Sequence, residues 1–200
     1  MGRTGTAWGG VVGPVTFISA WAIGGTVEDG YSPIDQAISR LAAIDASARV
    51  LMTVGLATLG VGMLLFATAL RVGIGGLAWV GAAVTGIVTL GIVATPLGRT
   101  ATVDQLHAAF AVTGYVSLVA MPMLAAGRLR RKGLARLSLA VGGLAAVCLV
   151  GAVSGLFAPG LLQRAGLTLV HVWVVGMAAS LLRDSPPVPR DPIDGQWPSQ

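Results

Sequence analysis

Two residues near the start of the fourth apolar run have side chains suited to proton transfer. Asp104 and His107 are three positions apart, so they lie on one face of a helix. A carboxylate at that spacing can orient an imidazole or exchange a proton with it. Thr102 and Gln105 match a capping box at the start of this helix, and Asp104, which lies between them, would occupy the first turn. The pair is interpreted either as a catalytic acid and base or as a capping acid beside an interfacial histidine.

A second polar group opens the last apolar run. Gln163 and Arg164 stand at its start, and His171 follows Arg164 by seven positions on the same helix face, about 10 Å deeper. A histidine within a membrane span is a functional candidate, although it can also be a core residue bonded to a nearby Ser or Thr. Arg164, like Arg99, is interpreted either as an anion-binding group or as one half of an ion pair with Asp35 or Asp104.

The third polar group lies between the first two apolar runs, at residues 26–47. Ser32, Pro33 and Asp35 match the start of a helix with a capping box. Apolar residues then recur at helical spacing, at Ile34, Ile38, Leu41 and Ile44. The pattern predicts a short amphipathic helix, which is either a linker at the interface or a lid over the bundle.

Long apolar runs must position these groups. Runs almost free of charge occupy residues 8–25, 48–70, 74–95, 105–126, 137–158 and 163–182, and each can span about 30 Å of hydrocarbon. We therefore predict an all-α membrane protein, a six-transmembrane-helix bundle formed by residues 1–183. Residues 184–200 contain five prolines among charged residues, which predicts a flexible cytoplasmic tail.

Bulk composition agrees with a membrane protein. Of the 200 residues 54% are hydrophobic and 10% are charged, and the mean hydropathy is +0.81. The net charge of +5 comes from residues in short gaps between apolar runs, which disfavours a nucleic-acid surface. Cys148 is the only cysteine, so the sequence excludes an intramolecular disulfide.

The basic residues predict the orientation in the membrane. Nine of the thirteen fall on one side of the six runs, whereas the other side carries four arginines and five acids. Cytoplasmic loops are enriched in Lys and Arg, so both termini are predicted to be cytoplasmic. Arginine in preference to lysine and abundant Ala, Gly and Val suggest a bacterial genome, and hence the bacterial cytoplasmic (inner) membrane.

With that orientation, the three polar groups meet at the outer mouth of the bundle. Asp104 and His107 are the catalytic candidates there. The ligand-binding candidates are Tyr31, Ser32, Asp35, Ser39, Arg99, Gln163, Arg164 and His171. Membrane lipid is an expected partner. At the site, the alternatives for the ligand are a lipid headgroup and a small polar molecule. At the Gly-rich faces, the alternatives for the partner are another membrane protein and a second copy of this chain.

Several motifs of well-known enzymes are absent from the sequence. It has no HExxH motif, GxSxG elbow or Walker loop, and no Asp, Glu or Lys at the centre of a span. Two histidines at different depths are poorly placed to hold one haem. We therefore predict no cofactor and no metal, and an enzymatic function is not favoured.

The order of these motifs resembles a known group of proteins. The run Tyr31-Ser32-Pro33-Ile34-Asp35-Gln36-Ala37-Ile38-Ser39-Arg40-Leu41 follows the first span, Pro96, Asp104 and His107 precede or open the fourth, and Gly160, Gln163, Arg164 and Trp173 mark the sixth. Together they are similar to the bacterial membrane proteins catalogued as domain of unknown function 998. The resemblance covers nearly the whole chain, although the family favours an acid where this chain has Arg40 and a glycine near Ala42. It supports the fold, carries no activity, and directs attention to Ser39, His107 and Arg164.

Three functions remain open from the sequence. The first is a non-enzymatic transporter or accessory subunit that binds a lipid headgroup or small polar ligand at the outer mouth. The second is an intramembrane enzyme that uses Asp104 and His107 on a lipid-borne substrate, with Arg164 holding an anionic group. The third is a structural subunit of a membrane complex, joined through Gly-rich helix faces.

Overall fold

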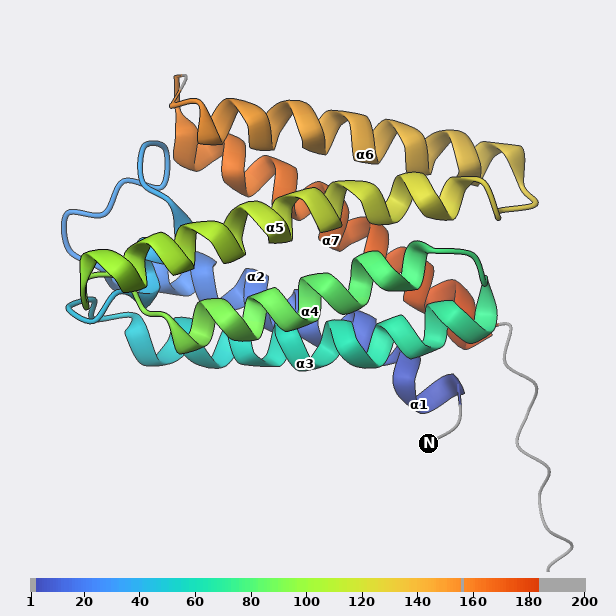
Figure 1. Ribbon diagram of the computed structural model, residues 1–200, viewed down its shortest axis with the longest axis horizontal. Helices are drawn as coiled ribbons and strands as arrows, with labels where there is room; N and C mark the ends of the chain where they lie inside the picture. The colour runs from blue at the N-terminus through green and yellow to red at the C-terminus, as the bar shows by residue number, and fades with distance from the viewer. Residues whose placement is uncertain (1–2, 156, 184–200) are drawn as a thin grey trace, which may run out of the picture.

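The computed structural model describes residues 3–155 and 157–183, and the regular elements in these two ranges are all helices (Figure 1). In chain order they are α1 (Arg3–Ala7), α2 (Gly9–Val27), the 3-10 helix η1 (Ile38–Ala42), α3 (Arg49–Gly73), α4 (Ala78–Ala94), α5 (Ala101–Ala126), α6 (Lys132–Val153) and α7 (Pro159–Arg183).

Most of these helices have the length and composition of membrane spans. Five segments are long and apolar enough to cross a membrane, namely Gly5–Val27, Arg49–Gly73, Ala101–Ala126, Lys132–Val153 and Pro159–Arg183. The apolar helix α4 has 17 residues, a length of about 26 Å at the usual helical rise. The prediction of an all-α, multi-pass membrane protein is confirmed.

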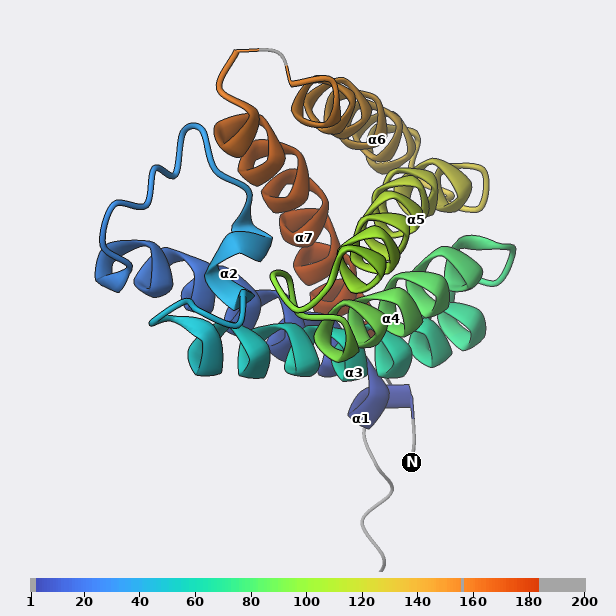
Figure 2. The ribbon, with the colours of Figure 1, turned by 60° about the vertical axis from the view of Figure 1, so that its left-hand side comes forward.

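The long helices form an up-and-down bundle. Each helix from α2 to α7 packs against the next one along the chain (Figures 1 and 2). The last helix, α7, also contacts α1, α2, α3 and α5, so it connects the first helices of the chain to the last. Side chains from α7 can therefore meet side chains from most of the bundle.

Glycines allow close contact between neighbouring helices. A Cβ atom added at Gly62 of α3 would lie 2.6 Å from the carbonyl oxygen of Gly9 in α2. A Cβ atom added at Gly86 of α4 would lie 2.8 Å from the carbonyl oxygen of Gly60 in α3. Small residues at both seams let the backbones of α2, α3 and α4 approach one another.

The two ends of the bundle differ in charge. The acidic end, on the left in Figure 1, holds the loop between α2 and α3 and the turns α4–α5 and α6–α7. All acids in the described ranges belong to it, namely Glu28, Asp29, Asp35, Asp45 and Asp104. The basic end, on the right, holds the turns α3–α4 and α5–α6 and both ends of the described chain.

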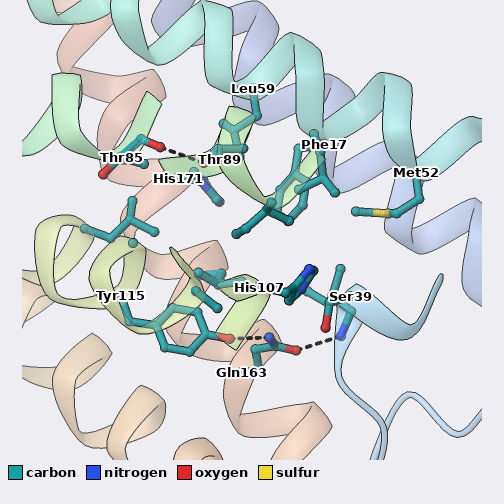
Figure 3. Close-up of a pocket in the computed structure, with 17 residues that line it drawn as sticks. Phe17, Ser39, Met52, Leu59, Thr85, Thr89, His107, Tyr115, Gln163 and His171 are labelled. Atoms are coloured by element: carbon teal, nitrogen blue, oxygen red, sulfur yellow. Dashed lines mark hydrogen bonds between the residues drawn. The ribbon is translucent and has the colours of Figure 1, made fainter. Parts of the chain in front are cut away.

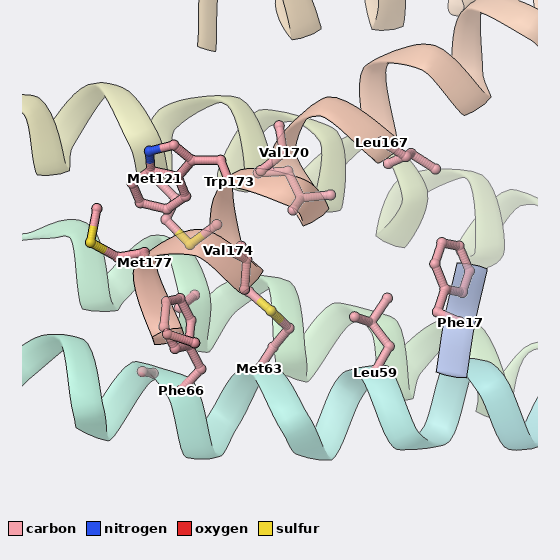
Figure 4. Close-up of a cluster of buried hydrophobic side chains, with 14 of the residues drawn as sticks. Phe17, Leu59, Met63, Phe66, Met121, Leu167, Val170, Trp173, Val174 and Met177 are labelled. Carbon is pink, nitrogen blue, oxygen red and sulfur yellow. The ribbon is translucent and has the colours of Figure 1, made fainter. Parts of the chain in front are cut away.

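Large apolar side chains fill the half of the bundle nearer the basic end. Met63 and Phe66 of α3, Met121 of α5, and Val170 and Val174 of α7 are completely buried in this cluster (Figure 4). Side chains of this kind stabilise the bundle by tight packing. They also separate the basic end from the interior nearer the acidic end.

The loop helix differs from the prediction. A short helix is present, but η1 begins at Ile38 rather than at Ser32. At Ser32 the predicted cap forms around a single turn only, because Asp35 N–H donates to Ser32 Oγ (3.2 Å) and Gln36 N–H donates to Ser32 O (2.8 Å). The backbone here bonds to α7: Leu161 N–H donates to Ile34 O (3.0 Å), and Ile38 N–H donates to the Gln163 side chain (2.7 Å). Groups bonded to α7 are not available for a continuous helix.

Two predicted helix boundaries also change. Helix α5 begins at Ala101, because Thr100 rather than Thr102 accepts a hydrogen bond from Val103 N–H (3.2 Å) and caps the helix. Helix α6 ends at Val153, not at residue 158, because Gly155 (φ 66°) and Ala158 (φ 53°) turn the chain toward α7. The predicted tail at 184–200 lies outside the described residues.

Candidate functional site

The start of α7 is tied to the first loop by Arg164. Its Nη1 donates to the carbonyl oxygens of Pro33 (2.7 Å), Gly160 (2.9 Å) and Gln36 (3.0 Å), and its Nη2 donates to the Tyr31 hydroxyl. Gly160 allows this approach, because a Cβ atom there would lie 2.8 Å from Pro33 O. Arg164 therefore fixes the position of the loop over the end of the bundle.

Aromatic rings surround the Arg164 guanidinium. Its central carbon lies 5.5 Å from the ring centroid of Trp21 and 5.4 Å from that of Tyr31, which are cation–π distances. Burial raises the pKa of the Tyr31 hydroxyl, and the neighbouring Arg164 partly offsets that rise. Tyr31 is thus held neutral and can act as an uncharged acceptor for the guanidinium.

The expected ion pairs of Arg99 and Arg164 with Asp35 or Asp104 do not form. Arg164 bonds to carbonyl oxygens and to Tyr31 instead, and Arg99 is exposed. In the described part of the chain the single salt bridge joins Arg40 to Asp45, at 2.7 Å. The hydrogen bond from Arg40 lowers the pKa of the exposed Asp45 carboxyl. Arg40 is therefore engaged on the surface.

Gln163 connects the loop to α5. Its side-chain oxygen accepts from Ile38 N–H (2.7 Å), and its side-chain nitrogen donates to the Tyr115 hydroxyl. The hydroxyl oxygen of Tyr115 is thereby used as an acceptor, so its own proton is left to donate. Gln163 thus fixes Tyr115 of α5 and the start of η1 relative to α7.

His107 is buried, with 4% of its surface exposed, and its ring is oriented by α4. Its Nδ1 lies 2.7 Å from the carbonyl oxygen of Thr95, just after the end of α4. A carbonyl oxygen only accepts hydrogen bonds, so Nδ1 carries a proton, and in a neutral imidazole the lone pair is then on Nε2. That Nε2 atom is buried and has no hydrogen-bond partner among the described residues.

Asp104 does not bond to His107 in this structure. Its Oδ1 accepts a hydrogen bond from Gly98 N–H (2.9 Å) and so stabilises the turn between α4 and α5. The positive φ of Gly98 (83°) suits a glycine in this turn. Asp104 and His107 instead face a common pocket as separate groups.

His171 lies on α7 about two turns beyond Gln163, roughly 12 Å deeper along the helix. It is 1% exposed, and its ring packs edge-on against Phe17 with centroids 5.3 Å apart. Neither ring nitrogen has a hydrogen-bond partner within the described ranges. The alternative of a core histidine bonded to a nearby Ser or Thr is therefore not observed.

The acidic-end pocket has a volume of about 360 Å³. Its polar lining residues are Asp35, Ser39, Asp104, His107, Tyr115 and Gln163. Loop residues form one wall and the start of α5 another, with the α6 end and the α7 start completing the pocket. Asp35 and Asp104 are its charged lining residues, so it has a negative electrostatic character.

A smaller inner cavity of about 70 Å³ adjoins the acidic-end pocket (Figure 3). The two spaces share Ser39, His107, Ala111, Tyr115 and Gln163. The inner cavity extends to His171, Phe17, Thr85 and Thr89. His107 and the other shared residues therefore stand between the acidic-end pocket and the His171 end of the inner cavity.

The Thr85 and Thr89 hydroxyls of the inner cavity already donate to the protein, whereas the Tyr115 hydroxyl keeps a proton that can be donated. Thr89 donates to Thr85 O (2.7 Å), Thr85 and Ser117 share a hydrogen bond of 2.8 Å, and Ser117 donates to Gly114 O (2.9 Å). What Thr85 and Thr89 still offer is oxygen lone pairs. With the Nε2 lone pair of His107, the cavity is rich in acceptors and suits a ligand that carries N–H or O–H donors.

The structure separates the sequence-predicted residues into two groups. Asp35, Ser39, Asp104, His107, Gln163 and His171 line the two connected spaces. The others lie outside both: Tyr31 and Arg164 bond to each other, Ser32 bonds to Asp35, and Arg99 is exposed. Within the described residues, no three His, Cys, Asp or Glu side chains are grouped so that they could hold a metal ion.

Sequence reasoning missed the residues that complete the inner cavity. Tyr115, Thr85, Thr89 and Phe17 line it but were not predicted. The spacing of Thr85 and Thr89, one turn apart within an otherwise apolar run, is the signal that could have identified two of them. Phe17 carries no such signal, because its place beside His171 depends on how α2 packs on α7.

Comparison with known proteins agrees with the fold. Neither the comparison with curated proteins nor the comparison with solved structures gave a match. A family model described as "Protein of unknown function (DUF998)" matches residues 11–180, which include every residue of the two connected spaces. The match covers most of the chain, and on this basis the protein belongs to the DUF998 family of unknown function.

Proposed function

We propose that the protein binds a small polar ligand or a lipid headgroup in the acidic-end pocket and the inner cavity, as a transporter or accessory subunit. The favoured ligand group carries N–H or O–H donors and, where it is charged, a positive charge. A protonated primary amine is the simplest group with both properties. The sequence left open an anionic or a polar headgroup as the ligand. The proposed ligand group is more specific, because it is a donor and is not anionic.

The single observation that carries the proposal is the state of the two histidines. Three buried ring nitrogens, Nε2 of His107 and both nitrogens of His171, have no hydrogen-bond partner in the described chain, and both residues line one cavity. An unsatisfied buried polar group costs about 1–3 kcal/mol. A ligand that donates to Nε2 of His107 and to the unprotonated ring nitrogen of His171 would remove much of that cost.

Charge supports a cationic rather than an anionic ligand. Asp35 and Asp104 line the entrance, while the nearest buried cation, Arg164, is engaged by three carbonyl groups and Tyr31. An anion would meet two carboxylates and find no available guanidinium in the pocket. A cation would be attracted by both.

The apolar cluster around Met63, Phe66 and Val174 supports binding from the acidic end only. Beyond the inner cavity, α3, α5 and α7 all continue with buried apolar residues toward the basic end. Transport would therefore require a second conformation in which these helices separate, whereas an accessory subunit would not. We place the acidic end outside and both termini in the cytoplasm of a bacterial cell, because the excess of Lys and Arg is at the basic end.

The charge preference can be tested with three ligands of similar size. The purified protein in a neutral detergent would be melted with ethanolamine, ethylene glycol or glycolate. A ligand that binds the folded state raises the melting temperature. We expect the largest rise with cationic ethanolamine and the smallest with anionic glycolate.

A matched pair of variants links the effect to the pocket. Asp104→Asn keeps an oxygen that can accept from Gly98 N–H but removes the charge, and should weaken ethanolamine binding about fivefold, for a pair worth about 1 kcal/mol. Asp29→Asn removes a charge from the same end outside the pocket and should have little effect. An equal loss in both variants, or a preference for glycolate, would contradict the proposal.

A second candidate, an intramembrane enzyme, is favoured by one observation. The Thr95 carbonyl holds the proton of His107 on Nδ1, which leaves Nε2 as a base beside Ser39 in the pocket. Native mass spectrometry of lipids that co-purify with the wild type and with His107→Ala distinguishes the two. A binder would retain the same unmodified lipid or none, whereas an enzyme would yield a modified lipid that is missing in His107→Ala.

A further inference from the structure

An apolar groove runs between α6 and α7 and shares no lining residue with the acidic-end pocket. It has a volume of about 790 Å³ and is lined chiefly by apolar side chains, including Leu137, Val141, Leu169, Val172 and Trp173. Leu137 and Val172 are more than half exposed. In a membrane-spanning helix pair, such a surface faces lipid chains.

A basic pocket of about 830 Å³ lies at the end of this groove. Four arginines line it: Arg128, Arg130 and Arg131 from the turn between α5 and α6, and Arg183 from the end of α7. None of their side chains has a hydrogen bond or an ion pair within residues 3–155 and 157–183, and no acid in those ranges lies at this end. Within the described part of the chain, the pocket therefore has a positive charge that no acid balances.

The groove and the basic pocket are continuous. Leu134, Gly176, Met177 and Ser180 line both of them. A single molecule that fits both must have an anionic group at one end and an apolar chain at the other. These are the features of an anionic phospholipid, whose phosphate can accept paired hydrogen bonds from a guanidinium.

Other basic residues near this end are engaged elsewhere or do not line the pocket. Arg71 lies over the ring of Trp79, with its central carbon 5.1 Å from the ring centroid. Lys132 and Arg136 are exposed on the first turns of α6 and do not line the pocket. The positive-inside rule would explain an excess of basic residues at this end. It does not explain why four arginines line one pocket.

We infer that the α6–α7 groove and the basic pocket form a binding site for an anionic phospholipid in the leaflet at the basic end. The arginines bind the phosphate, and one acyl chain lies along the groove against Trp173. Trp173 is fixed there by a hydrogen bond from its ring N–H to Ser138 (2.9 Å). This site is separate from the acidic-end pocket and does not depend on the proposed function.

Binding to the purified protein in neutral detergent tests the inference, with dissociation constants from native mass spectrometry. The probes are phosphatidylglycerol, phosphatidylcholine with the same acyl chains, and glycerol 3-phosphate as the headgroup without chains. We expect phosphatidylglycerol to bind at least tenfold more tightly than either of the others. Equal binding of the two lipids, or equal binding of glycerol 3-phosphate, would overturn the inference.

Two double variants with the same net charge separate the pocket from general electrostatics. Arg130→Gln with Arg131→Gln should weaken phosphatidylglycerol binding roughly 25-fold, at about fivefold for each arginine. Lys132→Gln with Arg136→Gln removes two charges from the same end outside the pocket and should leave binding within a few fold. An equal loss in both double variants would overturn the inference.

A third variant tests the groove while leaving all the arginines in place. A Cβ atom at Gly176 meets no atom within 4 Å, so Gly176→Leu can be accommodated in α7 and would fill the junction of groove and pocket. It should reduce phosphatidylglycerol binding at least tenfold, with the melting temperature in the absence of lipid unchanged or raised. Wild-type affinity in Gly176→Leu would contradict the assignment of the acyl chain to the groove.

Discussion

At the scale of single residues, Arg164 and the two histidines differ in how much of their hydrogen bonding the protein supplies. Both terminal nitrogens of Arg164 donate to protein atoms, and only its Nε lacks a partner in the described chain, as the histidine nitrogens do. Arg164 fixes the loop through three carbonyl groups and the Tyr31 hydroxyl. His107 and His171 leave ring nitrogens without protein partners beside a cavity. Buried polar groups that break the rules of stable packing are characteristic of functional sites. Arg164 therefore has a structural role, and the histidines are the residues available to a ligand.

The role of Arg164 predicts a large loss of stability when it is replaced. Arg164→Met removes the donors to Pro33, Gln36 and Gly160, and hydrogen bonds to charged groups are worth about 1.5–3 kcal/mol each. We expect a loss of at least about 3 kcal/mol, measured as a lower melting temperature in detergent. Arg99→Gln, at an exposed arginine of the same end, should melt as the wild type does. Similar melting of the two variants would contradict the structural role.

The sequence identified Gln163, Arg164, Asp104 and the histidines as unusual, but not their partners. Residue type and position are sufficient to mark a cation or an imidazole in an apolar run. The partners of Arg164 are backbone carbonyls of residues 33 and 36, about 130 positions away, which carry no signal in residue type. The ion pair, one of the two alternatives that the sequence left open, is not found among the described residues, because Arg164 donates to carbonyl groups instead.

At the scale of elements, the loop from Tyr31 to Ala42 and the start of α7 behave as one unit. Arg164 and Gln163 bond to the loop, and Leu161 N–H donates to Ile34 O. The loop forms one wall of the acidic-end pocket through Asp35 and Ser39. The shape of the pocket therefore depends on how closely α7 approaches the loop.

Gly160 controls that approach and supplies a prediction. In Gly160→Ala, the new Cβ would collide with Gln36 O and lie 2.8 Å from Pro33 O, so the loop must move away from α7. We expect faster limited proteolysis of the 31–42 loop and a lower melting temperature than in the wild type. Gly176→Ala, where a Cβ meets nothing within 4 Å on the same helix, is the control and should show neither change. Unchanged proteolysis of Gly160→Ala would show that the loop is not held as described.

Apolar runs were sufficient to predict the long helices, because a span needs about 20 apolar residues. They were less informative about where a helix ends. Residues 154–158 continue the apolar composition of the fifth run, but α6 ends at Val153, and Thr100 caps α5 two residues before the predicted box. The loop helix shifted to Ile38 because its backbone bonds to α7, a contact that local sequence cannot encode.

At the scale of the whole molecule, charge divides the bundle. In the described residues, the acids and the pocket with the histidines lie at one end, and the arginines of the turn between α5 and α6, which have no partner there, lie at the other. The excess of Lys and Arg at the basic end predicts that this end faces the cytoplasm. The acidic-end pocket would then be open to ligands from outside the cell.

Cysteine accessibility tests this orientation. In a chain with Cys148→Ala, Arg99→Cys at the acidic end should react with a membrane-impermeant maleimide in intact cells. Arg131→Cys at the basic end should react only after the membrane is permeabilised. Both positions are exposed in the structure, so burial does not limit labelling. The reverse pattern would place the acidic-end pocket in the cytoplasm.

The central claim is that His171 serves a ligand rather than the fold, and melting of the His171→Phe variant with and without ethanolamine tests it most directly. Phenylalanine fills a similar space beside Phe17 and removes two ring nitrogens without partners. We predict that His171→Phe melts at or above the wild-type temperature, because an unsatisfied polar group costs about 1–3 kcal/mol, and that ethanolamine no longer stabilises it. A variant that melts well below the wild type and is still stabilised by ethanolamine would contradict the claim.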